Sequence, residues 1–214
     1  MNNKLVTRFL RIPSVMLFAL VLFLLSTHAA WGQTPQPNVS AEMLPNGNVL
    51  NPEALMKACA PHVAKENIDR VTHVESKWNA FAININYQKR YLDRQPSSKE
   101  EAISTAQRLL KANAGLKDYS LDLGVAMINT KNLIRYNVDL ATVFDPCTNL
   151  QWADFFLVDC YQRASKLLAG EEAIKAAFSC YNTGNFKTGL ENGYVAKIYR
   201  AVPKRHVRVV AYEH

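Results

Sequence analysis

The sequence predicts a single, mainly α-helical domain. Several segments place apolar residues at intervals of three and four, the spacing of one buried helix face, and only one short stretch alternates as a strand does. The 214 residues are enough for one domain with its own core, and 49% hydrophobic with 20% charged residues is typical of a folded chain. We expect one domain over residues 53–200, with about five or six helices and at most a short strand or extended loop segment.

Residues 1–32 have the pattern of a secretory signal peptide. Basic residues precede an uncharged apolar run over 15–25, and small residues follow at 27–32. An uncleaved membrane anchor is the alternative, but a run of about eleven residues is short of the ~20 that span a bilayer. We therefore expect the mature protein in the periplasm, with no stable membrane span. Residues 33–52, rich in proline, glycine and asparagine, predict an irregular leader.

The first helix of the domain is predicted to begin near Pro52 or Pro61 and to end around Glu75-Ser76. Its buried stripe consists of apolar residues near helical spacing, namely Val63, Ile68, Val71 and Val74. Further along the chain, the alternation in Ile83–Tyr87 indicates a short strand or an extended loop.

Ser98–Glu101 has the pattern of a capping box, which predicts the start of the next helix. That helix carries Ile103, Ala106, Leu109 and Leu110, and Asn113–Gly115 closes it. A further short helix is expected to contain Gly124 to Leu133.

Asp145-Pro146 predicts the start of a long helix, because proline suits the first turn. Gly170 is expected to end it, after an apolar face made of Leu150, Ala153, Leu157, Cys160, Tyr161, Ala164, Leu167 and Leu168. Glu171 and Glu172 then open another helix at the end where the helix dipole favours acids, and Gly184 ends it. The predicted buried face of that helix consists of Ile174, Ala177, Phe178 and Tyr181.

The four cysteines predict two disulfides, because an even number in an exported chain favours disulfide bonds. Cys147 and Cys160 are expected on one helix, roughly 20 Å apart at the rise of an α-helix, whereas a disulfide needs Cα atoms within about 7 Å. Cys59 should therefore pair with Cys147 or with Cys180, and Cys160 with the other. A metal site is the alternative, but there is no Cys-x-x-Cys and the histidines do not cluster with the cysteines. We expect neither a metal nor a cofactor.

The charge balance suits a wall or membrane surface and does not indicate nucleic acid as a partner. The formal net charge is +7, and the three basic residues of the signal peptide leave with it, so the mature chain keeps +4. Part of this charge lies in the tail 201–214, whose basic stretch we interpret as a solvated end, with a partner contact as the alternative. The chain has no Gly-x-Ser-x-Gly motif and no phosphate-binding glycine loop.

Glu75 is the first candidate for catalysis. It lies beside the buried stripe of its predicted helix and near the helix C-terminus, where the dipole disfavours a carboxylate. Trp78 follows three residues later and could shield it from water. Each factor would raise the pKa of Glu75, as a general acid at neutral pH requires, and the same pattern of a carboxyl against a tryptophan is known from lysozyme. The ordinary alternative is an exposed glutamate at a helix end.

Four segments, in this order, resemble the motifs of the soluble lytic transglycosylases: 74–82 around Glu75-Ser76, 123–129, 145–150, and 177–185 around Tyr181-Asn182. The cysteines within these segments, with Arg94-Gln95-Pro96, look most like the branch that serves type IV secretion and conjugation systems. The resemblance covers residues 58–197. Four ordered motifs are a specific signal, whereas one alone would be weak.

This resemblance implies a lysozyme-like helical domain that cleaves the MurNAc–GlcNAc β-1,4 bond of peptidoglycan. Glu75 would protonate the leaving oxygen and then take the proton of the MurNAc C6 hydroxyl, which attacks the anomeric carbon. The product would be a 1,6-anhydro sugar. The implied partners are peptidoglycan glycan strands and type IV secretion components, for which the enzyme would open the wall locally.

Motif position implies substrate-binding roles for Ser76, Met127, Asn129, Tyr181 and Asn182. The hydroxyl of Tyr181 would orient Glu75, and Ser76 would bond near the carboxylate or the substrate. For both residues an ordinary structural role is the alternative. The family usually carries glutamine at the position of Met127, and methionine cannot donate the hydrogen bond that glutamine offers a sugar. We expect the Ala126-Met127 departure to weaken activity without changing the fold.

Two other functions stay open. An inactive wall-binding scaffold would fit the Met127 departure, although Glu75-Ser76 and Tyr181-Asn182 are retained. A lysozyme-type hydrolase would need a second carboxylate within roughly 5–10 Å of Glu75. None stands beside Glu75 in its motif, but Asp93, Asp122 and Asp145 are candidates.

Overall fold

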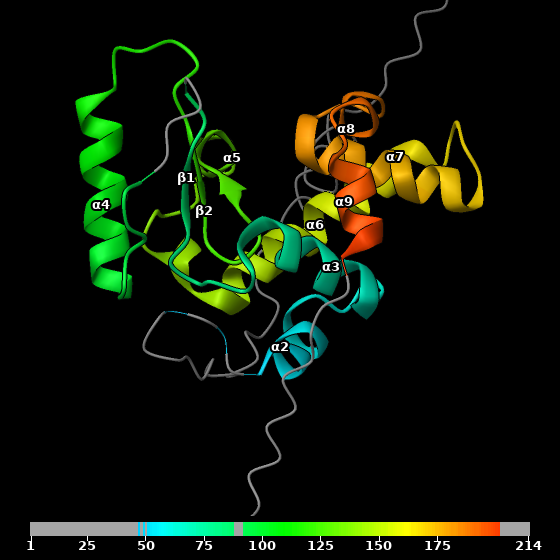
Figure 1. The fold of residues 1–214 in the computed structure, drawn as a ribbon, viewed down its shortest axis with the longest axis horizontal. Coiled ribbons are helices and arrows are strands. Elements are labelled where there is room, and N and C mark those ends of the chain that lie inside the picture. Colours follow the sequence, from blue (N-terminus) through cyan, green and yellow to red (C-terminus); the bar gives the residue numbers. More distant parts are fainter. Residues whose placement is uncertain (1–46, 48, 50, 88–91, 202–214) are drawn as a thin grey trace, which may run out of the picture. The chain divides into compact units, whose positions relative to one another are not determined.

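The computed structural model describes residues 47, 49, 51–87 and 92–201. It is mainly helical with one small sheet, which confirms the predicted fold class. The expected signal peptide, most of the leader and the tail after residue 201 lie outside the described residues. The elements, labelled as in Figure 1, are α2 (Pro52–Cys59), α3 (Lys65–Ser76), β1 (Ile83–Ile85), α4 (Lys99–Ala112), β2 (Leu121–Leu123), β3 (Ile128–Asn129), α5 (Thr130–Arg135), the 3-10 helix η1 (Thr142–Phe144), α6 (Pro146–Ala164), α7 (Gly170–Thr183), α8 (Thr188–Glu191) and α9 (Tyr194–Arg200).

Helix α6 occupies the middle of the domain and packs against α2, α7, η1 and β3. Helices α7, α8 and α9 pack together, and α9 also packs against α3 (Figure 1). This arrangement brings the C-terminal end of the domain against its first helices. No helix in the described ranges is long and apolar enough to cross a membrane.

The sheet is antiparallel, with the strands in the order β1-β2-β3. Alternation places its apolar residues in the core, namely Ile83, Ile85, Leu121, Leu123 and Ile128. On the other face, Asn84 lies opposite Asp122, and Asp122 lies opposite Asn129. The sheet therefore presents one row of polar side chains, and the strand predicted within Ile83–Tyr87 is confirmed.

The helix predicted from Gly124 to Leu133 is wrong in its first half. Residues 124–127 form the turn between β2 and β3, and α5 begins only at Thr130, where the side chain of Asn129 accepts a bond from the Lys131 N–H at 2.9 Å. Gly124 has φ +78° and Met127 has φ +52°. A right-handed helix cannot contain such left-handed residues, so the chain turns here.

Helix α3 ends where the sequence predicted. Lys77 and Trp78 both adopt left-handed backbone conformations, with φ values of 56° and 66°. Two consecutive left-handed residues that are not glycine are strained, and such strain gathers near functional sites. Here it follows Glu75-Ser76 directly.

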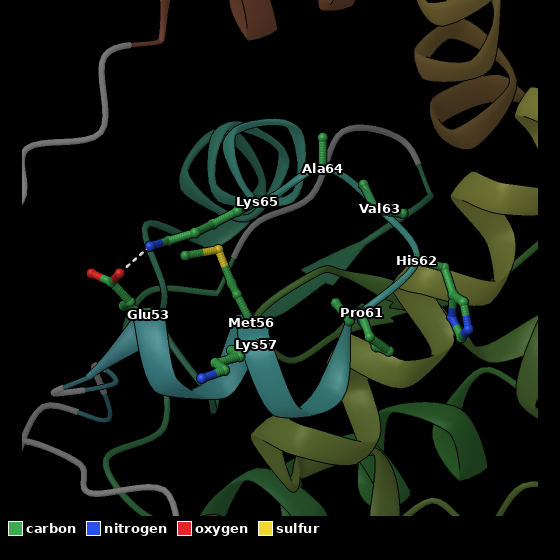
Figure 2. Close-up of a pocket in the computed structure, with 9 residues that line it drawn as sticks. Glu53, Met56, Lys57, Pro61, His62, Val63, Ala64 and Lys65 are labelled. Carbon is green, nitrogen blue, oxygen red and sulfur yellow. Dashed lines mark hydrogen bonds and ion pairs between the residues drawn. The ribbon is translucent and has the colours of Figure 1, made fainter.

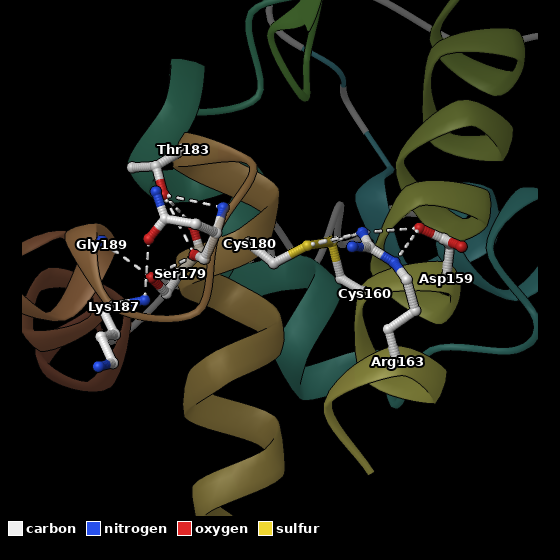
Figure 3. The surroundings of a disulfide bond; sticks show 9 residues. Asp159, Cys160, Arg163, Ser179, Cys180, Thr183, Lys187 and Gly189 are labelled. Atoms are coloured by element: carbon white, nitrogen blue, oxygen red, sulfur yellow. Dashed lines mark hydrogen bonds and ion pairs between the residues drawn. A yellow bond between two sulfur atoms is a disulfide. The ribbon is translucent and has the colours of Figure 1, made fainter. Parts of the chain in front are cut away.

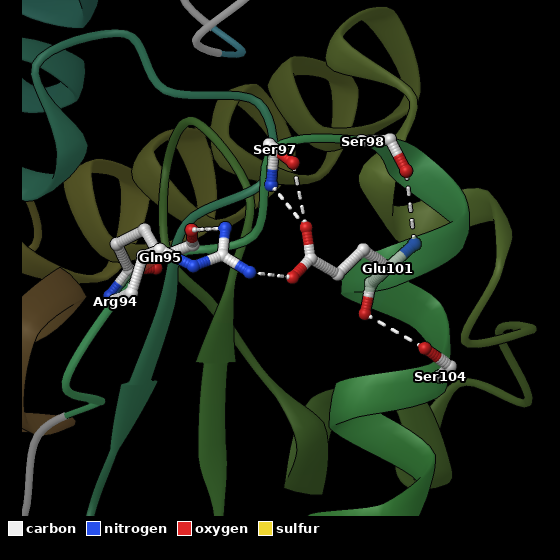
Figure 4. Close-up of polar contacts among 6 residues, drawn as sticks. All are labelled: Arg94, Gln95, Ser97, Ser98, Glu101 and Ser104. Carbon is white, nitrogen blue, oxygen red and sulfur yellow. Dashed lines mark hydrogen bonds and ion pairs between the residues drawn. The ribbon is translucent and has the colours of Figure 1, made fainter.

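The start of α4 carries half of the predicted capping box. The Ser98 hydroxyl accepts a bond from the Glu101 N–H at 3.1 Å, but the Glu101 carboxylate turns to Ser97, accepting from its N–H and its hydroxyl at 2.8 Å each (Figure 4). These bonds and the ion pair with Arg94 hold the pKa of Glu101 at about 2. The side-chain amide of the neighbouring Gln95 accepts a bond from the Ile83 N–H at 2.8 Å and donates one to the Ile83 carbonyl at 3.0 Å, which covers the edge of β1.

Helix α6 begins as predicted, with the Asp145 side chain accepting a bond from the Thr148 N–H at 2.8 Å. Its predicted end at Gly170 is wrong, because α6 stops at Ala164 and Gly170 belongs to α7. Three residues of the predicted buried face are exposed: Leu167 is 74%, Leu168 42% and Tyr161 44% exposed. Their spacing fitted the pattern, but none of the described elements covers that end of the helix closely enough to bury them. Helix α7 ends at Gly184, as predicted, in a left-handed conformation.

Two disulfides join α6 to its neighbours, Cys59 to Cys147 and Cys160 to Cys180. This agrees with the predicted exclusion of a Cys147–Cys160 bond, since both residues lie on α6. After α7 the chain forms two short helices, separated at Gly193, so the described part holds more and shorter helices than expected.

Candidate active site

Glu75 lies in the last turn of α3 and is partly buried. The hydroxyl of Tyr194 donates a hydrogen bond to its Oε1 atom at 2.5 Å. Burial raises the pKa of Glu75 from 4.5 to about 7, the bond from Tyr194 lowers it, and the negative charge of Asp122 raises it. Around neutral pH the carboxyl is therefore half protonated, which is the state that a general acid and base needs.

Tyr194 begins α9 and is 7% exposed. Gly193, with φ +80°, and the Asn192 side chain, which accepts a bond from the Tyr194 N–H at 2.9 Å, turn the chain into the helix at this point. The sequence prediction missed this residue. Tyr194, Val195 and Ile198 have the spacing of a buried stripe, and a buried tyrosine hydroxyl needs a partner, but the spacing cannot tell which partner.

Three helices hold the 124–127 turn beside the end of α3. The Ser76 hydroxyl, at the end of α3, donates to the carbonyl of Val125 at 2.7 Å. The Tyr181 hydroxyl, on α7, donates to the carbonyl of Ala126 at 2.6 Å. The interpretation that Tyr181 orients Glu75 by a direct bond is therefore corrected, because Tyr194 makes that bond instead.

The third anchor of the turn is Asn149 on α6, which is fully buried. Its amide donates to the carbonyls of Leu123 and Val143 at 2.9 and 2.8 Å, and its Oδ1 accepts from the Ala126 N–H at 2.8 Å. A Cβ atom on Gly124 would lie 2.2 Å from the Asn149 Nδ2 atom, so the turn requires glycine here for space as well as for its φ. Asn149 lies in the third motif but was not singled out as functional.

Asp122, on β2, accepts bonds from the amides of Asn84, Asn86 and Asn129 at 3.2, 2.5 and 2.7 Å. Burial raises the pKa of Asp122, and these three bonds act in the opposite direction. Its negative charge acts on Glu75, so the polar face of the sheet and the end of α3 belong to one electrostatic environment.

The other two candidate acids have different surroundings. Asp145 caps α6, and Asp93 is exposed. Among the described acids, Asp122 is the one whose charge acts on Glu75. Burial also raises the pKa of both Tyr181 and Tyr194 well above 10, so both hydroxyls stay protonated and act as donors at neutral pH.

The predicted substrate-binding residues lie in three places. Ser76, Met127 and Tyr181 meet at the 124–127 turn, and Asn129 lies in the polar row of the sheet. Asn182 is exposed, and its Oδ1 accepts a bond from the Asn192 amide at 3.1 Å. It thus joins the end of α7 to the segment before α9.

Trp78 was predicted to shield Glu75. It is buried, and its indole N–H donates to Asp69 at 3.0 Å, so its side chain is fixed against α3. That its ring shields Glu75 from water stays a prediction.

A cavity of about 430 Å³ lies between α2 and the segment 61–65 (Figure 2). It is lined by residues such as Met56, Lys57 and Val63, and Glu75 is not among them. The carboxylate at its edge, Glu53, is exposed and forms an ion pair with Lys65. Burial raises the pKa of Glu75 to about 7, so we place the chemistry at Glu75 and not at this cavity. The described residues contain no group of three acids, histidines or cysteines that could hold a metal ion.

The chain is similar to proteins of type IV secretion systems. The chain is 40% identical over 151 residues to the type IV secretion system protein virB1 of Brucella suis biovar 1 and of Brucella abortus strain 2308, which covers 67% of this chain and 60% of each relative. It is 30% identical over 145 residues to the protein virB1 of Agrobacterium fabrum, covering 68% of this chain and 56% of that relative. The chain thus spans about 60% or less of the length of these relatives. No family model and no solved structure matches.

Proposed function

Because this chain belongs to the family of the VirB1 proteins of type IV secretion systems, we propose that it is a peptidoglycan lytic transglycosylase with Glu75 as its acid and base. The observation that carries the proposal is the environment of Glu75. Burial raises the pKa of this carboxyl to about 7 at the end of α3, beside two protonated tyrosine hydroxyls. A carboxyl with such a pKa can give and accept a proton at neutral pH.

The reaction needs one proton to leave Glu75 and one to return. The protonated carboxyl gives its proton to the oxygen of the MurNAc–GlcNAc bond, and the bond from the MurNAc anomeric carbon to that oxygen breaks. The carboxylate then takes the proton of the MurNAc C6 hydroxyl, whose oxygen bonds to the anomeric carbon. The product is a 1,6-anhydro sugar, no water is consumed, and Glu75 ends in its starting state.

Tyr194 serves both halves of this reaction. Its hydroxyl occupies Oε1 of Glu75 and leaves Oε2 for the substrate. A hydrogen bond to a carboxylate is stronger than one to a neutral carboxyl, so Tyr194 stabilises Glu75 while its proton is away. It also fixes the carboxyl group in one orientation, which is a requirement for acid catalysis on a bound sugar.

The substrate-binding surface proposed here consists of the 124–127 turn and the polar row of the sheet. Met127 and Asn129 lie on these elements, and Ser76 and Tyr181 hold the turn in place. From its motif position, we propose that Asn182 contacts the substrate at the margin of this surface. We propose that a secretory signal peptide, residues 1–32, exports the enzyme to the periplasm, where it opens the wall for a type IV secretion apparatus.

The substitution Glu75→Gln tests the assignment, because glutamine keeps the shape of the side chain and cannot supply a proton. We expect the release of soluble fragments from purified peptidoglycan to fall by about 10²- to 10⁴-fold, while sedimentation with insoluble peptidoglycan stays unchanged. Release at the wild-type rate by the variant would contradict the proposal. Binding without release by both proteins would instead favour the wall-binding scaffold.

A second candidate function is a lysozyme-type hydrolase, and Asp122 is the observation that favours it. Its carboxylate shares the environment of Glu75, as the second acid of a hydrolase does. The substitution Asp122→Asn separates the two mechanisms. In a transglycosylase it removes a charge that raises the pKa of Glu75, so the pH profile moves to lower pH and the maximal rate changes little. In a hydrolase the rate falls by a factor of about 100 or more at every pH.

A further inference from the structure

The disulfide between Cys160 and Cys180 lies directly beside a residue of the proposed site. Cys160 belongs to α6, and Cys180 belongs to the last part of α7, immediately before Tyr181. Tyr181 donates the 2.6 Å bond that holds the Ala126 carbonyl of the 124–127 turn. The covalent bond therefore acts on α7 one residue away from the hydroxyl that holds the turn.

This disulfide lies outside the main hydrophobic core. Cys160, Ala177 and Cys180 form a small separate cluster, with Phe186 packed against it. The other disulfide is different, because Cys59 and Cys147 are both part of the main core. Phe178 belongs to the main core and Tyr181 packs against it, so the disulfide holds the side of α7 at Cys180, where the small separate cluster lies.

Arg163 adds a charged contact at the same place (Figure 3). Its Nη2 atom lies 3.0 Å from the Sγ of Cys180 and 3.5 Å from the Sγ of Cys160, and its guanidinium forms an ion pair with Asp159 at 2.9 Å. The guanidinium also lies over the ring of Phe186, 5.8 Å from its centroid. Arg163 thus covers the disulfide and joins α6 to the segment that follows α7.

The far side of α7 is held by hydrogen bonds of its own. The Ser179 hydroxyl donates to the Asn185 carbonyl and accepts from the Gly189 N–H, both at 2.8 Å (Figure 3). These bonds attach α8 to α7, and α8 in turn packs against α9, which carries Tyr194. These contacts connect the end of α7 to both tyrosines of the site.

We propose that the Cys160–Cys180 disulfide is a positioning element of the active site, so that the site is assembled only in the oxidised protein. With the bond intact, Tyr181 reaches Ala126 and the turn is held against the end of α3. With the bond reduced, the end of α7 moves away from α6, the turn loses one of its three anchors, and water enters around Glu75. The rest of the domain keeps its fold, because the main core does not depend on this bond.

Reduction needs a dithiol such as dithiothreitol, which supplies two electrons and two protons. The S–S bond breaks, Cys160 and Cys180 become thiols, and the dithiol is oxidised to its cyclic disulfide.

The test compares two double variants, Cys160→Ala/Cys180→Ala and the matched control Cys59→Ala/Cys147→Ala. Each protein is labelled with ¹³C at the glutamate carboxyls, and the titration of Glu75 is followed by NMR. Wild type is expected to titrate at about 7. We expect the Cys160/Cys180 variant to titrate clearly lower, toward 4.5, because water reaches the carboxyl, and the control to stay near 7. The same midpoint in the two variants would overturn the proposal.

Tyr181→Phe is a second variant, which tests the link between α7 and the site even if a cysteine variant does not fold. It keeps the disulfide and removes the bond to Ala126, so the midpoint of Glu75 should again fall; an unchanged midpoint would overturn the link between α7 and the site. The titration needs no substrate, so its result does not depend on the proposed function. The proposed function would instead be contradicted by a wild-type protein that does not cleave the wall. Where wild type does cleave, the Cys160/Cys180 variant is expected to lose about 100-fold in rate.

Discussion

The hydroxyl of Tyr194 and the Oε1 atom of Glu75 lie 2.5 Å apart and join α9 to the end of α3 across 119 residues of sequence. The bond is made inside the domain by a tyrosine whose pKa lies well above 10, so the hydroxyl is the donor throughout the neutral range. It lowers the pKa of Glu75 against the larger effect of burial. The bond from Tyr194 therefore offsets part of the rise in the pKa of Glu75 that burial causes.

The substitution Tyr194→Phe tests this directly. Phenylalanine keeps the ring in the core and removes the hydrogen bond that lowers the pKa of Glu75, so that pKa should rise above 7. The basic limb of the pH–rate profile should move to higher pH by the same amount. An unchanged or lower midpoint in a carboxyl titration of the folded variant would contradict the role given to Tyr194.

The raised pKa of Glu75 also makes stability depend on pH. The unfolded chain loses this proton near 4.5 and the folded protein near 7, so between these values the folded state holds one proton more. The free energy of unfolding of wild type should therefore fall as the pH rises, by up to about 3 kcal/mol in total. Glu75→Gln has no carboxyl at this position and should not lose stability in this way. The free energy of unfolding of the variant minus that of wild type should therefore increase between pH 4.5 and pH 8. Denaturant unfolding of both proteins at several pH values measures this difference. If the free energies of unfolding of the two proteins change with pH in parallel, the carboxyl of Glu75 is not buried and uncharged.

Met127 gives a prediction about activity. Its left-handed conformation in the 124–127 turn fixes where the side chain begins, and the substitution Met127→Gln adds an amide that can donate to a sugar. One such bond is worth on the order of 1 kcal/mol, so the rate of wall cleavage should rise about five-fold. Met127→Leu is the control, because it changes the shape without adding a donor. If both variants equal wild type in rate, the departure at this position does not weaken the enzyme.

Gly124 gives a prediction about stability. In Gly124→Ala the new Cβ would lie 2.2 Å from the Asn149 Nδ2 atom, at a residue whose φ of +78° already disfavours alanine. We expect the free energy of unfolding to fall by about 2–4 kcal/mol. Gly115→Ala is the matched control, because a Cβ there meets nothing within 4 Å and the residue has no positive φ. Equal unfolding midpoints for the two variants would contradict the packing of Asn149 against the turn.

Local signals predicted most of the fold. The capping serine at Ser98, the proline after Asp145 and the glycine at Gly184 each mark a helix end by their own chemistry, and the structure has the ends there. The prediction failed where the pattern continued without packing to support it. Leu167 and Leu168 have the right spacing for α6, but burial depends on what lies opposite, which spacing does not describe.

The candidate site was predictable only in part, for a related reason. Glu75 could be proposed because the features that predict a raised pKa, a buried stripe and a helix end, are local in sequence. Tyr194 and Asn149 bond to residues that are far away in the sequence. The sequence around either residue does not indicate which group it bonds. Tyr181 was selected by its motif position as a residue whose hydroxyl orients Glu75, but this hydroxyl donates to the backbone carbonyl of Ala126, and Tyr194 makes the bond to Glu75.

The masses of the fragments released from purified peptidoglycan test the central claim most directly. Oxidised wild-type protein and its Glu75→Gln variant would be incubated with the same preparation, and the soluble products analysed by mass spectrometry. We predict 1,6-anhydro muropeptides, one water lighter than hydrolysis products, from wild type and none from the variant. Products with a free reducing end from wild type, or anhydro products from Glu75→Gln, would contradict a transglycosylase that uses Glu75 as its acid and base.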